Sequence, residues 1–359
     1  MMVPERMIGA VLTGPEQLQI RELPVAALGA GELLLRVGAA TTCGTDVKVY
    51  RRGGHPRMLK VPTLFGHEMA GTVAALGSGG HKFSVGERIV VANSAPCGEC
   101  DYCRRKRHNL CRSLVYLNGA FAEYVRVPAA FVARNTYRIP DALPFARAAL
   151  CEPLACVLHG LDACELERRA VSSGTEEVAE VVVFGAGPIG LLFVAALARE
   201  PVRIILADPN PDRLALGERM GAHDSVHIAR GGGQARAVRA ATRGGEGAEI
   251  VIDATGVPQV WRDAIDTACI GGLVNLFGGC AKGTEVPLDT HRVHYDELTI
   301  KGVYHHRPAT MQRALALLSD PDFPAGLLLS DTVSIAQVES ALRAMIDKRA
   351  LKVVVQGTA

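Results

Sequence analysis

The sequence has almost no net charge, no uninterrupted apolar run long enough for a membrane span, and no recognisable secretory leader. Its 39 basic and 37 acidic side chains leave a formal charge of +2, so no global field draws a polyanion, and nucleic acid is not favoured as a partner. The most apolar stretch, 181–198, is interrupted by three glycines and a proline. The start, MMVPERMIGAVL, lacks the charged and apolar regions of a signal peptide. These absences predict a cytoplasmic protein with no membrane partner.

Cysteine is the residue whose distribution needs an explanation. Ten cysteines without a secretory leader indicate a reducing compartment, where clustered thiols serve metal binding or catalysis rather than disulfides. Four of them lie in the fifteen-residue segment CGECDYCRRKRHNLC, at Cys97, Cys100, Cys103 and Cys111. The spacing alone leaves open a redox pair, a structural metal site and a zinc module for nucleic acid. The last of these lacks stacking aromatics and a wider basic face.

The pattern of strands and helices changes along the chain. At 359 residues, two domains are expected. Residues 1 to about 155 give short β-rich pieces separated by glycine and proline, whereas from about residue 180 apolar strands alternate with helical segments. Strands in alternation with helices indicate βαβ units around a parallel sheet. The predicted fold class is therefore α/β, with a β-rich domain followed by a doubly wound parallel-sheet domain.

A glycine-rich turn follows the first strand of the second region. The segment VVVFGAGPIG has the G-x-G-x-x-G spacing between a predicted strand and a predicted helix. Gly185 permits the tight turn, Gly187 lets the backbone approach a pyrophosphate, and Gly190 lets helix and strand pack closely. The next strand ends in Asp208, where a carboxylate accepts ribose hydroxyls and repels a 2′-phosphate. The pattern predicts a dinucleotide site that prefers NAD over NADP; a βαβ unit that binds nothing is the alternative. The predicted cofactor-binding residues are Gly185, Gly187, Pro188, Ile189, Gly190, Asp208, Arg213 and Thr255.

Three segments carry side chains that zinc prefers. The segments TTCGTDVKVY, LFGHEMAG and LCEPLACVLHG hold Cys43, Thr45, Asp46, His67, Glu68 and Glu152. A cysteine, a histidine and a carboxylate that leave the fourth position open make a catalytic zinc site rather than a closed structural one. Each segment alone is also compatible with an ordinary packed cysteine or a surface His–Glu pair.

In their order along the chain, these segments resemble the zinc-dependent medium-chain dehydrogenases of the alcohol dehydrogenase superfamily, most closely the sorbitol (L-iditol 2-) dehydrogenase branch. The shared motifs are C-G-T-D, G-H-E-x-x-G, the four-cysteine segment, F-A-E-Y, E-P-L, G-A-G-P-I-G and K-G-V-Y, and they cover nearly the whole chain. The resemblance implies a GroES-like catalytic domain at residues 1–155 and 295–359, and a Rossmann NAD-binding domain at residues 156–294. It also implies a homodimer or homotetramer, with the Rossmann sheet continued across a dimer through the strand GLVNLF at 272–277.

The resemblance also implies the ligands of two zinc ions per chain. Cys43 and His67 are expected to bind a catalytic zinc, with either Glu68 or Glu152 completing the protein ligands. Asp46 is expected to accept a hydrogen bond from His67 and so fix its tautomer. The four clustered cysteines match the structural-zinc lobe of the family, in which four thiolates leave no position open for chemistry.

Further residues are implied near the substrate, and some of them depart from the family pattern. Thr45 is expected to hydrogen-bond the substrate hydroxyl. In many relatives a histidine is the last group of the relay that carries the substrate's proton out of the site. Here Lys48 holds that place, either as a member of the relay or as a solvated charge. Where sorbitol dehydrogenases carry arginine and tyrosine, this chain has His305 and His306, which are either substrate contacts or ordinary loop residues. Phe121 is a candidate for the substrate cleft, with core packing as the alternative.

The leading functional hypothesis is zinc-dependent, NAD-linked oxidation of a secondary alcohol of a polyol, cyclitol or sugar-derived substrate. The alternative is an L-threonine (β-hydroxy amino acid) dehydrogenase. That activity requires a cation for the substrate carboxylate, for which the candidates are His305, His306, Arg307 and Lys48. A more remote alternative is a non-catalytic protein that binds zinc and NAD, which one zinc per chain rather than two would favour.

Overall fold

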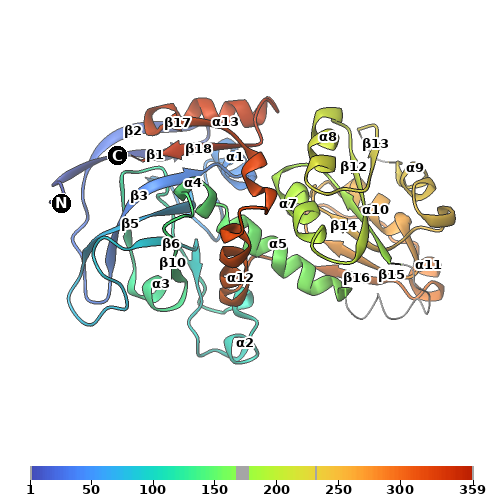
Figure 1. Ribbon diagram of the computed structural model, residues 1–359, viewed down its shortest axis with the longest axis horizontal. Helices are drawn as coiled ribbons and strands as arrows, with labels where there is room; N and C mark the ends of the chain where they lie inside the picture. The colour runs from blue at the N-terminus through green and yellow to red at the C-terminus, as the bar shows by residue number, and fades with distance from the viewer. Residues whose placement is uncertain (1, 167–177, 231–232, 358–359) are drawn as a thin grey trace. The chain divides into compact units, whose positions relative to one another are not determined.

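The computed structural model describes residues 2–166, 178–230 and 233–357 (Figure 1). The chain forms two compact units: unit 1 comprises Met1–Ala155 and His306–Ala359, and unit 2 comprises Cys156–His305. The division falls within helix α5 (Cys151–Cys164). Within the described ranges, every helix falls short of the length and apolar character that a membrane crossing requires.

Unit 1 is built on largely antiparallel sheets. Its strands are β1 (Arg6–Gly14), β2 (Gln17–Pro24), β3 (Leu33–Thr41), β4 (Thr63–Leu64), β5 (Glu68–Leu76), β6 (Arg88–Val91), β7 (Ser94–Ala95), β8 (Val115–Tyr116), β9 (Tyr124–Val127), β10 (Thr136–Arg138), β17 (Leu329–Ser334) and β18 (Lys352–Gln356). Its helices are α1 (Gly44–Arg52), α2 (Asp101–Arg104), α3 (Ala129–Arg134), α4 (Phe145–Ala148), α12 (Pro308–Ser319) and α13 (Val338–Ile346), with 3-10 helices η1 (His108–Leu110), η3 (Pro324–Leu328) and η4 (Ile335–Gln337).

The main sheet of unit 1 joins distant parts of the chain. Its strand order is β10-β6-β5-β3-β18-β17, with β9 also paired to β3. The C-terminal strand β18 lies beside β3, so the end of the chain belongs to this sheet. Thr41 at the end of β3 pairs in register with Glu68 on one side and with Val354 on the other. This register brings the start of β5 and the start of β18 to the same end of the sheet.

Unit 2 is a parallel sheet covered by helices. Its strands are β11 (Ala179–Phe184), β12 (Val202–Asp208), β13 (Asp224–His227), β14 (Ala248–Asp253), β15 (Ala268–Leu276) and β16 (Thr299–Gly302). Its helices, besides the end of α5, are α7 (Pro188–Leu197), α8 (Pro211–Arg219), α9 (Ala235–Ala240), α10 (Pro258–Thr267) and α11 (Thr290–Tyr295), with the 3-10 helix η2 (Arg243–Gly245).

The connections in unit 2 create a switch point at the middle of the sheet. The strand order is β13-β12-β11-β14-β15-β16, and every pairing is parallel. Because parallel crossovers are right-handed, the helices that follow β11 and β12 cover one face, while α9 and α10 cover the other (Figure 1). From β11 the strands are added first on one side, as β12 and β13, and then on the other, as β14 to β16. The order therefore reverses between β11 and β14, which is where doubly wound sheets bind ligands. The predicted fold class is confirmed.

Two details of the predicted layout differ in the structure. The strand at Thr299–Gly302 pairs with β15, so it extends the sheet of unit 2, and unit 1 resumes only at His306 instead of near residue 295. The strand GLVNLF, which was expected at a sheet edge, lies within β15 and has a neighbour on each side. The outermost strand on that side is β16, because the short polar strand TIKG pairs along β15.

Candidate active site and metal centres

The first turn of helix α1 fixes two of the predicted site residues. Cys43 is the N-cap of the helix, and its backbone N–H donates to Asp46 Oδ2 at 2.9 Å. In return, the Thr45 N–H points at Cys43 Sγ, 3.4 Å away. This reciprocal capping holds the Cys43 thiol and the Asp46 carboxylate together before any ligand binds.

His67 lies against the same carboxylate. Its Nδ1 is 2.8 Å from Asp46 Oδ1, and both side chains are buried. With Nδ1 engaged by the carboxylate, Nε2 is the ring nitrogen that can ligate a metal. Burial by itself lowers the pKa of His67, but Asp46 and the neighbouring Cys43 outweigh it and raise the pKa well above the ordinary value. A proton therefore competes with a metal for this ring, which is typical of histidine ligands.

Glu68 has one oxygen engaged and one without a donor. Glu68 Oε2 accepts from the Thr41 hydroxyl and from Lys352 Nζ, which also donates to Thr42 O at 2.7 Å. Among the described residues, no hydrogen-bond donor reaches the buried Glu68 Oε1. Lys352 was missed by the sequence reasoning; its only signal was a lysine at the start of the strand-like run KVVVQ.

The three side chains form a group that fits zinc. A ligand atom from each of Cys43, His67 and Glu68 lies within 4.8 Å of the other two. Thiolate, imidazole and carboxylate are the ligands of catalytic zinc sites, which keep a fourth position open. The donorless Glu68 Oε1 supports this fit, because a buried carboxylate oxygen without a partner is costly unless a cation compensates it.

Glu152, the other predicted carboxylate ligand, lies near this group but not in it. It is buried in the first turn of α5, and its Oε1 is 3.9 Å from His306 Nε2. Burial raises the pKa of Glu152 to about 7; the charge of Glu68 adds to this effect, whereas His67 and Lys352 oppose it. The two glutamates therefore have different partners: Glu68 has Thr41 and Lys352, and Glu152 has His306 nearby.

Other predicted residues of the catalytic unit lie in different surroundings. Thr45 is half-buried in the first turn of α1, and Lys48 is exposed on the same helix. Phe121 is 0% exposed and packs edge-to-face on Phe65, with ring centroids 5.8 Å apart. A cleft role for Phe121 is therefore corrected to core packing, because its ring fills the space beneath Gly66.

The two adjacent histidines occupy separate environments. His305 belongs to unit 2, is half-buried and has a φ of 61°, and its carbonyl accepts from His159 Nδ1 at 2.6 Å. His306 belongs to unit 1 and is buried, with its Nε2 2.8 Å from Asn93 Oδ1. Asn93, which follows β6, was not predicted from the sequence.

The glycine-rich turn of unit 2 has the expected geometry. Gly185 has a φ of 100°, which favours glycine, and Gly187 is the N-cap of α7 with Pro188 at the first helical position. A Cβ at Gly190 would lie 1.7 Å from the Gly185 carbonyl oxygen, so no side chain fits there. Ile189 follows Pro188 in the first turn of α7. The free N–H groups of this helix start are suited to a pyrophosphate.

Asp208 links the second strand to this turn. Its Oδ2 accepts from Ala186 N at 2.7 Å and its Oδ1 from Asn210 N at 2.8 Å, at the end of β12. Arg213 lies in the first turn of α8, where its backbone N–H donates to Asn210 Oδ1. The Asp208 carboxylate therefore already orders the loop that a ribose would approach.

Asp253 is a further residue of this switch point that the sequence reasoning missed. It ends β14, is fully buried, and accepts from Thr255 N at 3.1 Å, Thr255 Oγ1 at 2.5 Å and Gly256 N at 3.1 Å. Burial raises the pKa of Asp253, although these donors oppose the shift. Because a Cβ at Gly185 would approach Thr255 Cγ2 to 2.7 Å, Asp253 places Thr255 directly against the glycine turn.

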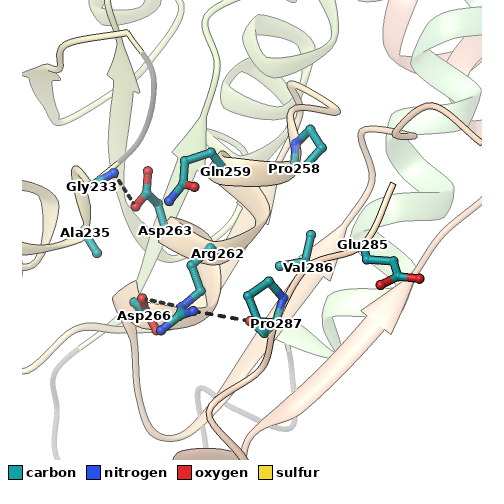
Figure 2. Close-up of a pocket in the computed structure, with 10 residues that line it drawn as sticks. All are labelled: Gly233, Ala235, Pro258, Gln259, Arg262, Asp263, Asp266, Glu285, Val286 and Pro287. Atoms are coloured by element: carbon teal, nitrogen blue, oxygen red, sulfur yellow. Dashed lines mark hydrogen bonds and ion pairs between the residues drawn. The ribbon is translucent and has the colours of Figure 1, made fainter. Parts of the chain in front are cut away.

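A separate pocket of about 420 Å³ lies beside helix α10 (Figure 2). It is lined by Gly233, Ala235, Pro258, Gln259, Arg262, Asp263, Asp266, Glu285, Val286 and Pro287. The single arginine among these residues is engaged by Asp266 and by the Pro287 carbonyl, while Asp263 accepts from Gly233 N. None of the predicted cofactor residues lines this pocket, and three of its side chains are acidic, Asp263, Asp266 and Glu285.

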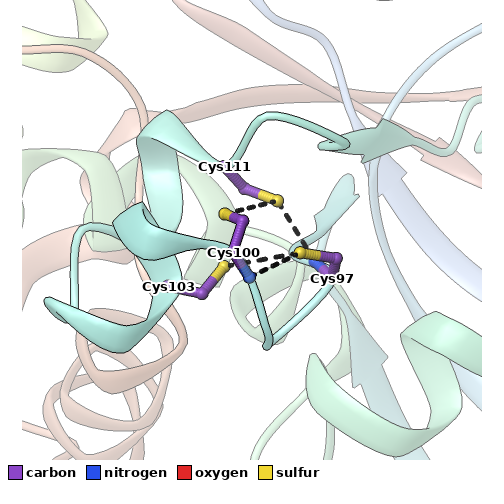
Figure 3. A group of neighbouring side chains, drawn as sticks. All are labelled: Cys97, Cys100, Cys103 and Cys111. Carbon is purple, nitrogen blue, oxygen red and sulfur yellow. Dashed lines mark hydrogen bonds between the residues drawn. The ribbon is translucent and has the colours of Figure 1, made fainter.

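The four clustered cysteines converge in unit 1 (Figure 3). Cys97 Sγ is 3.9 Å from Cys103 Sγ, Cys100 Sγ is 4.0 Å from Cys111 Sγ, and all four thiols are free. A regular tetrahedron with Zn–S distances of ~2.3 Å has S···S edges of ~3.8 Å. The spacing therefore fits a closed zinc site and excludes a disulfide knot.

The lobe supplies electrostatic support to some of these thiols. Backbone N–H groups, those of Arg112 and Cys103 first, lower the pKa of Cys100 to about 6, whereas burial raises the pKa of Cys103 to about 12. Part of the positive charge around the lobe is neutralised locally, since Arg105 and Arg112 both pair with Asp101. Four thiolates together need a cation, which zinc supplies.

Two family models match the chain, one in each region. Residues 29–141 match the family described as "Alcohol dehydrogenase GroES-like domain", and residues 188–320 match the one described as "Zinc-binding dehydrogenase". The first range contains the Cys43 and His67 group and the four-cysteine lobe, and the second contains Asp208 and most of the parallel sheet.

Known proteins similar to the chain cover nearly all of it. A sorbitol dehydrogenase from Bacillus subtilis (strain 168) is 29% identical over 347 residues, which is 95% of this chain and 94% of that protein. An L-threonine 3-dehydrogenase from Anaeromyxobacter dehalogenans (strain 2CP-C) is 34% identical over 290 residues, 79% of each. A protein from Sinorhizobium meliloti 1021, described as a zinc-binding dehydrogenase and solved bound to NADP, superposes with a TM-score of 0.86 at 28% identity, covering 98% of this chain and 100% of that one.

Proposed function

Because the chain belongs to the zinc-binding dehydrogenases of the alcohol dehydrogenase superfamily, we propose that it oxidises the secondary hydroxyl of a polyol, cyclitol or sugar-derived substrate with NAD. Family membership gives the enzyme class, zinc and a nicotinamide dinucleotide; the substrate and the preference for NAD are the proposal. One observation carries the substrate class. Two of the cations that could hold a substrate carboxylate are engaged with amide oxygens, His306 with Asn93 and Arg307 with Asn109.

The side chains divide the work of the reaction. When bound, zinc polarises the alcohol oxygen as a Lewis acid and the nicotinamide ring accepts the hydride. Cys43, His67 and a glutamate hold the metal, and Glu68 presents a buried oxygen for it. Asp46 keeps the proton of His67 on Nδ1, so that Nε2 stays available as a ligand. Thr45 Oγ1 accepts the hydrogen bond of the substrate hydroxyl.

One residue of the dinucleotide site, Asp208, supports the choice of NAD, and another, Arg213, would suit NADP. Asp208 places a carboxylate at the end of β12, where it favours ribose hydroxyls over a 2′-phosphate. The NADP in the Sinorhizobium meliloti structure makes this the part of the proposal that most needs a direct test. Arg213 on α8 is the one cation among the predicted cofactor residues, and it would be the partner of an NADP phosphate.

A second candidate is the oxidation of a β-hydroxy amino acid. The relative named L-threonine 3-dehydrogenase favours it at 34% identity. Of the cations named for the carboxylate in the catalytic unit, Lys48 is the exposed one, on helix α1. If L-threonine is the substrate, Lys48 is the candidate in unit 1 for binding its carboxylate, and Lys48→Met should then abolish threonine turnover.

The experiment is NADH formation by zinc-loaded protein with polyols, cyclitols, aldoses and L-threonine, with NAD and NADP in parallel. Turnover of a polyol, cyclitol or sugar with NAD supports the proposal; turnover of L-threonine alone refutes it. Faster turnover with NADP overturns the role given to Asp208.

Cys43→Ser should lose activity, whereas Cys280→Ser, at a half-buried cysteine of unit 2, serves as the matched control.

Assembly and cellular location remain predictions of the same proposal. We expect a homodimer or homotetramer, which light scattering of the purified protein tests directly. A cytoplasmic location is likewise expected, and fractionation of the source cells checks it.

A further inference from the structure

The segment that re-enters unit 1 is anchored by buried polar contacts. His306 is 2% exposed and Asn93 is 1% exposed, and His306 Nε2 lies 2.8 Å from Asn93 Oδ1. An amide oxygen can only accept, so the proton of this hydrogen bond resides on Nε2. The backbone carbonyl of Asn93 accepts from Leu117 N at 2.9 Å, which ties the main chain of this residue to the segment after β8.

The same imidazole nitrogen is also a close neighbour of Glu152. His306 Nε2 is 3.9 Å from Glu152 Oε1, beyond hydrogen-bond distance, while its N–H donates to the Asn93 amide oxygen. Both side chains are buried, where a carboxylate keeps a defined orientation only if polar groups surround it. A histidine held in place by Asn93 limits where the Glu152 carboxylate can lie.

The next two residues fix the backbone of this histidine. Arg307 Nε donates to Asn109 Oδ1 at 3.1 Å, and Asn109 lies in η1 between the third and fourth cysteines of the lobe. The Pro308 carbonyl accepts from Tyr137 Oη at 3.1 Å. His306 is therefore braced through its neighbours against the four-cysteine lobe and is not part of a loose loop.

We propose that His306 is a positioning residue, which acts through Asn93 and Glu152 to set the geometry of the catalytic metal site. This assignment rests on the proposed function, since it takes Glu152 to belong to that site. It replaces the expectation that His306 contacts the substrate. Its side chain is only 2% exposed, and its Nε2 is already hydrogen-bonded to Asn93.

The rate of metal release distinguishes a positioning role from a substrate contact, because the measurement contains no substrate. Partners that orient metal ligands typically change metal affinity or activity by about 10- to 100-fold when removed. We expect His306→Leu to speed release of the catalytic zinc to a chelator by about that factor, and to change the visible spectrum of the cobalt-substituted enzyme. His306→Gln, which keeps an N–H donor, should restore both towards the wild type.

The matched control is His291→Leu, the same substitution at an exposed histidine of unit 2, which should leave both readouts unchanged. If His306→Leu does not fold, Asn93→Ala removes the acceptor while keeping the histidine, and faster zinc release is again expected. If both variants release zinc at the wild-type rate and keep the wild-type cobalt spectrum, and only their KM is raised, the inference is wrong and His306 contacts the substrate. A wild-type protein that binds one zinc, or that oxidises no alcohol, refutes the proposed function instead.

Discussion

Replacing Lys352 by methionine tests how strongly the buried Glu68 carboxylate depends on its cation. Lys352 is 1% exposed, and its Nζ donates to Glu68 Oε2 and Thr42 O. Burial lowers the pKa of Lys352, but Glu68 and Cys43 outweigh this effect and raise it, so the ammonium stays charged. Methionine keeps most of the stem and removes the charge, which leaves Glu68 buried beside Thr41 without a cation.

The expected cost is large for a single substitution. Removing one partner of a buried ion pair typically costs about 3–5 kcal/mol, whereas exposed pairs contribute about 0–1 kcal/mol. Lys301→Met is the matched control, because its side chain is 42% exposed and its Nζ is 3.4 Å from Glu165 Oε1. We therefore expect Lys352→Met to lower the unfolding free energy of unit 1 several-fold more than Lys301→Met lowers that of unit 2.

The assay has to report on unit 1. The single tryptophan, Trp261, lies on α10 in unit 2, so its fluorescence follows the wrong unit. Hydrogen exchange of the β3 and β18 amides measures the right one, in protein whose catalytic zinc has been removed so that no metal compensates Glu68. The double variant Glu68→Gln/Lys352→Met should lose less than the sum of the single variants, because it leaves no uncompensated charge. A cost below about 1 kcal/mol for Lys352→Met, equal to the control, would refute the reasoning.

Three further outcomes are expected. Asp208→Ser should reduce the preference for NAD over NADP by about 10- to 100-fold in kcat/KM, because hydrogen bonds to a charged group are worth about 1.5–3 kcal/mol. Cys100→Ser should lower zinc content from two ions per chain to one by elemental analysis, whereas the buried Cys164→Ser should keep both. Gly190→Ala should abolish NAD binding in calorimetry, because its Cβ would meet the Gly185 carbonyl oxygen; unchanged affinity would mean that the turn relaxes freely.

Local spacing was enough to predict the parts of this protein that are local in the chain. The glycine turn at Gly185 and the four-cysteine lobe are each contained in fewer than twenty consecutive residues, and the structure places them as predicted. The α1 cap is equally local, since Cys43 and Asp46 are three residues apart, although it was not predicted. In each case the chemistry requires residue types at fixed short separations.

Contacts between distant residues were the part that spacing could not predict. Lys352 reaches Glu68 across 284 residues of chain because β3 pairs with both β5 and β18, and a sequence pattern does not fix that strand order. The partner of His306, Asn93, is 213 residues away. Phe121 was ambiguous for another reason: an aromatic side chain suits a cleft and a core equally until burial is known.

The two glutamates show why the choice of ligand also depends on such contacts. Both follow family motifs, and the sequence makes them equivalent candidates. Glu68 has its charge balanced by Lys352, and its remaining oxygen is buried without a donor, so geometry favours it as a ligand. Glu152 has a histidine N–H nearby instead of a bonded lysine, and burial raises its pKa, so a cation nearby would stabilise its charge more. One carboxylate is thus favoured as a ligand by its position, and the other by the electrostatics of its burial.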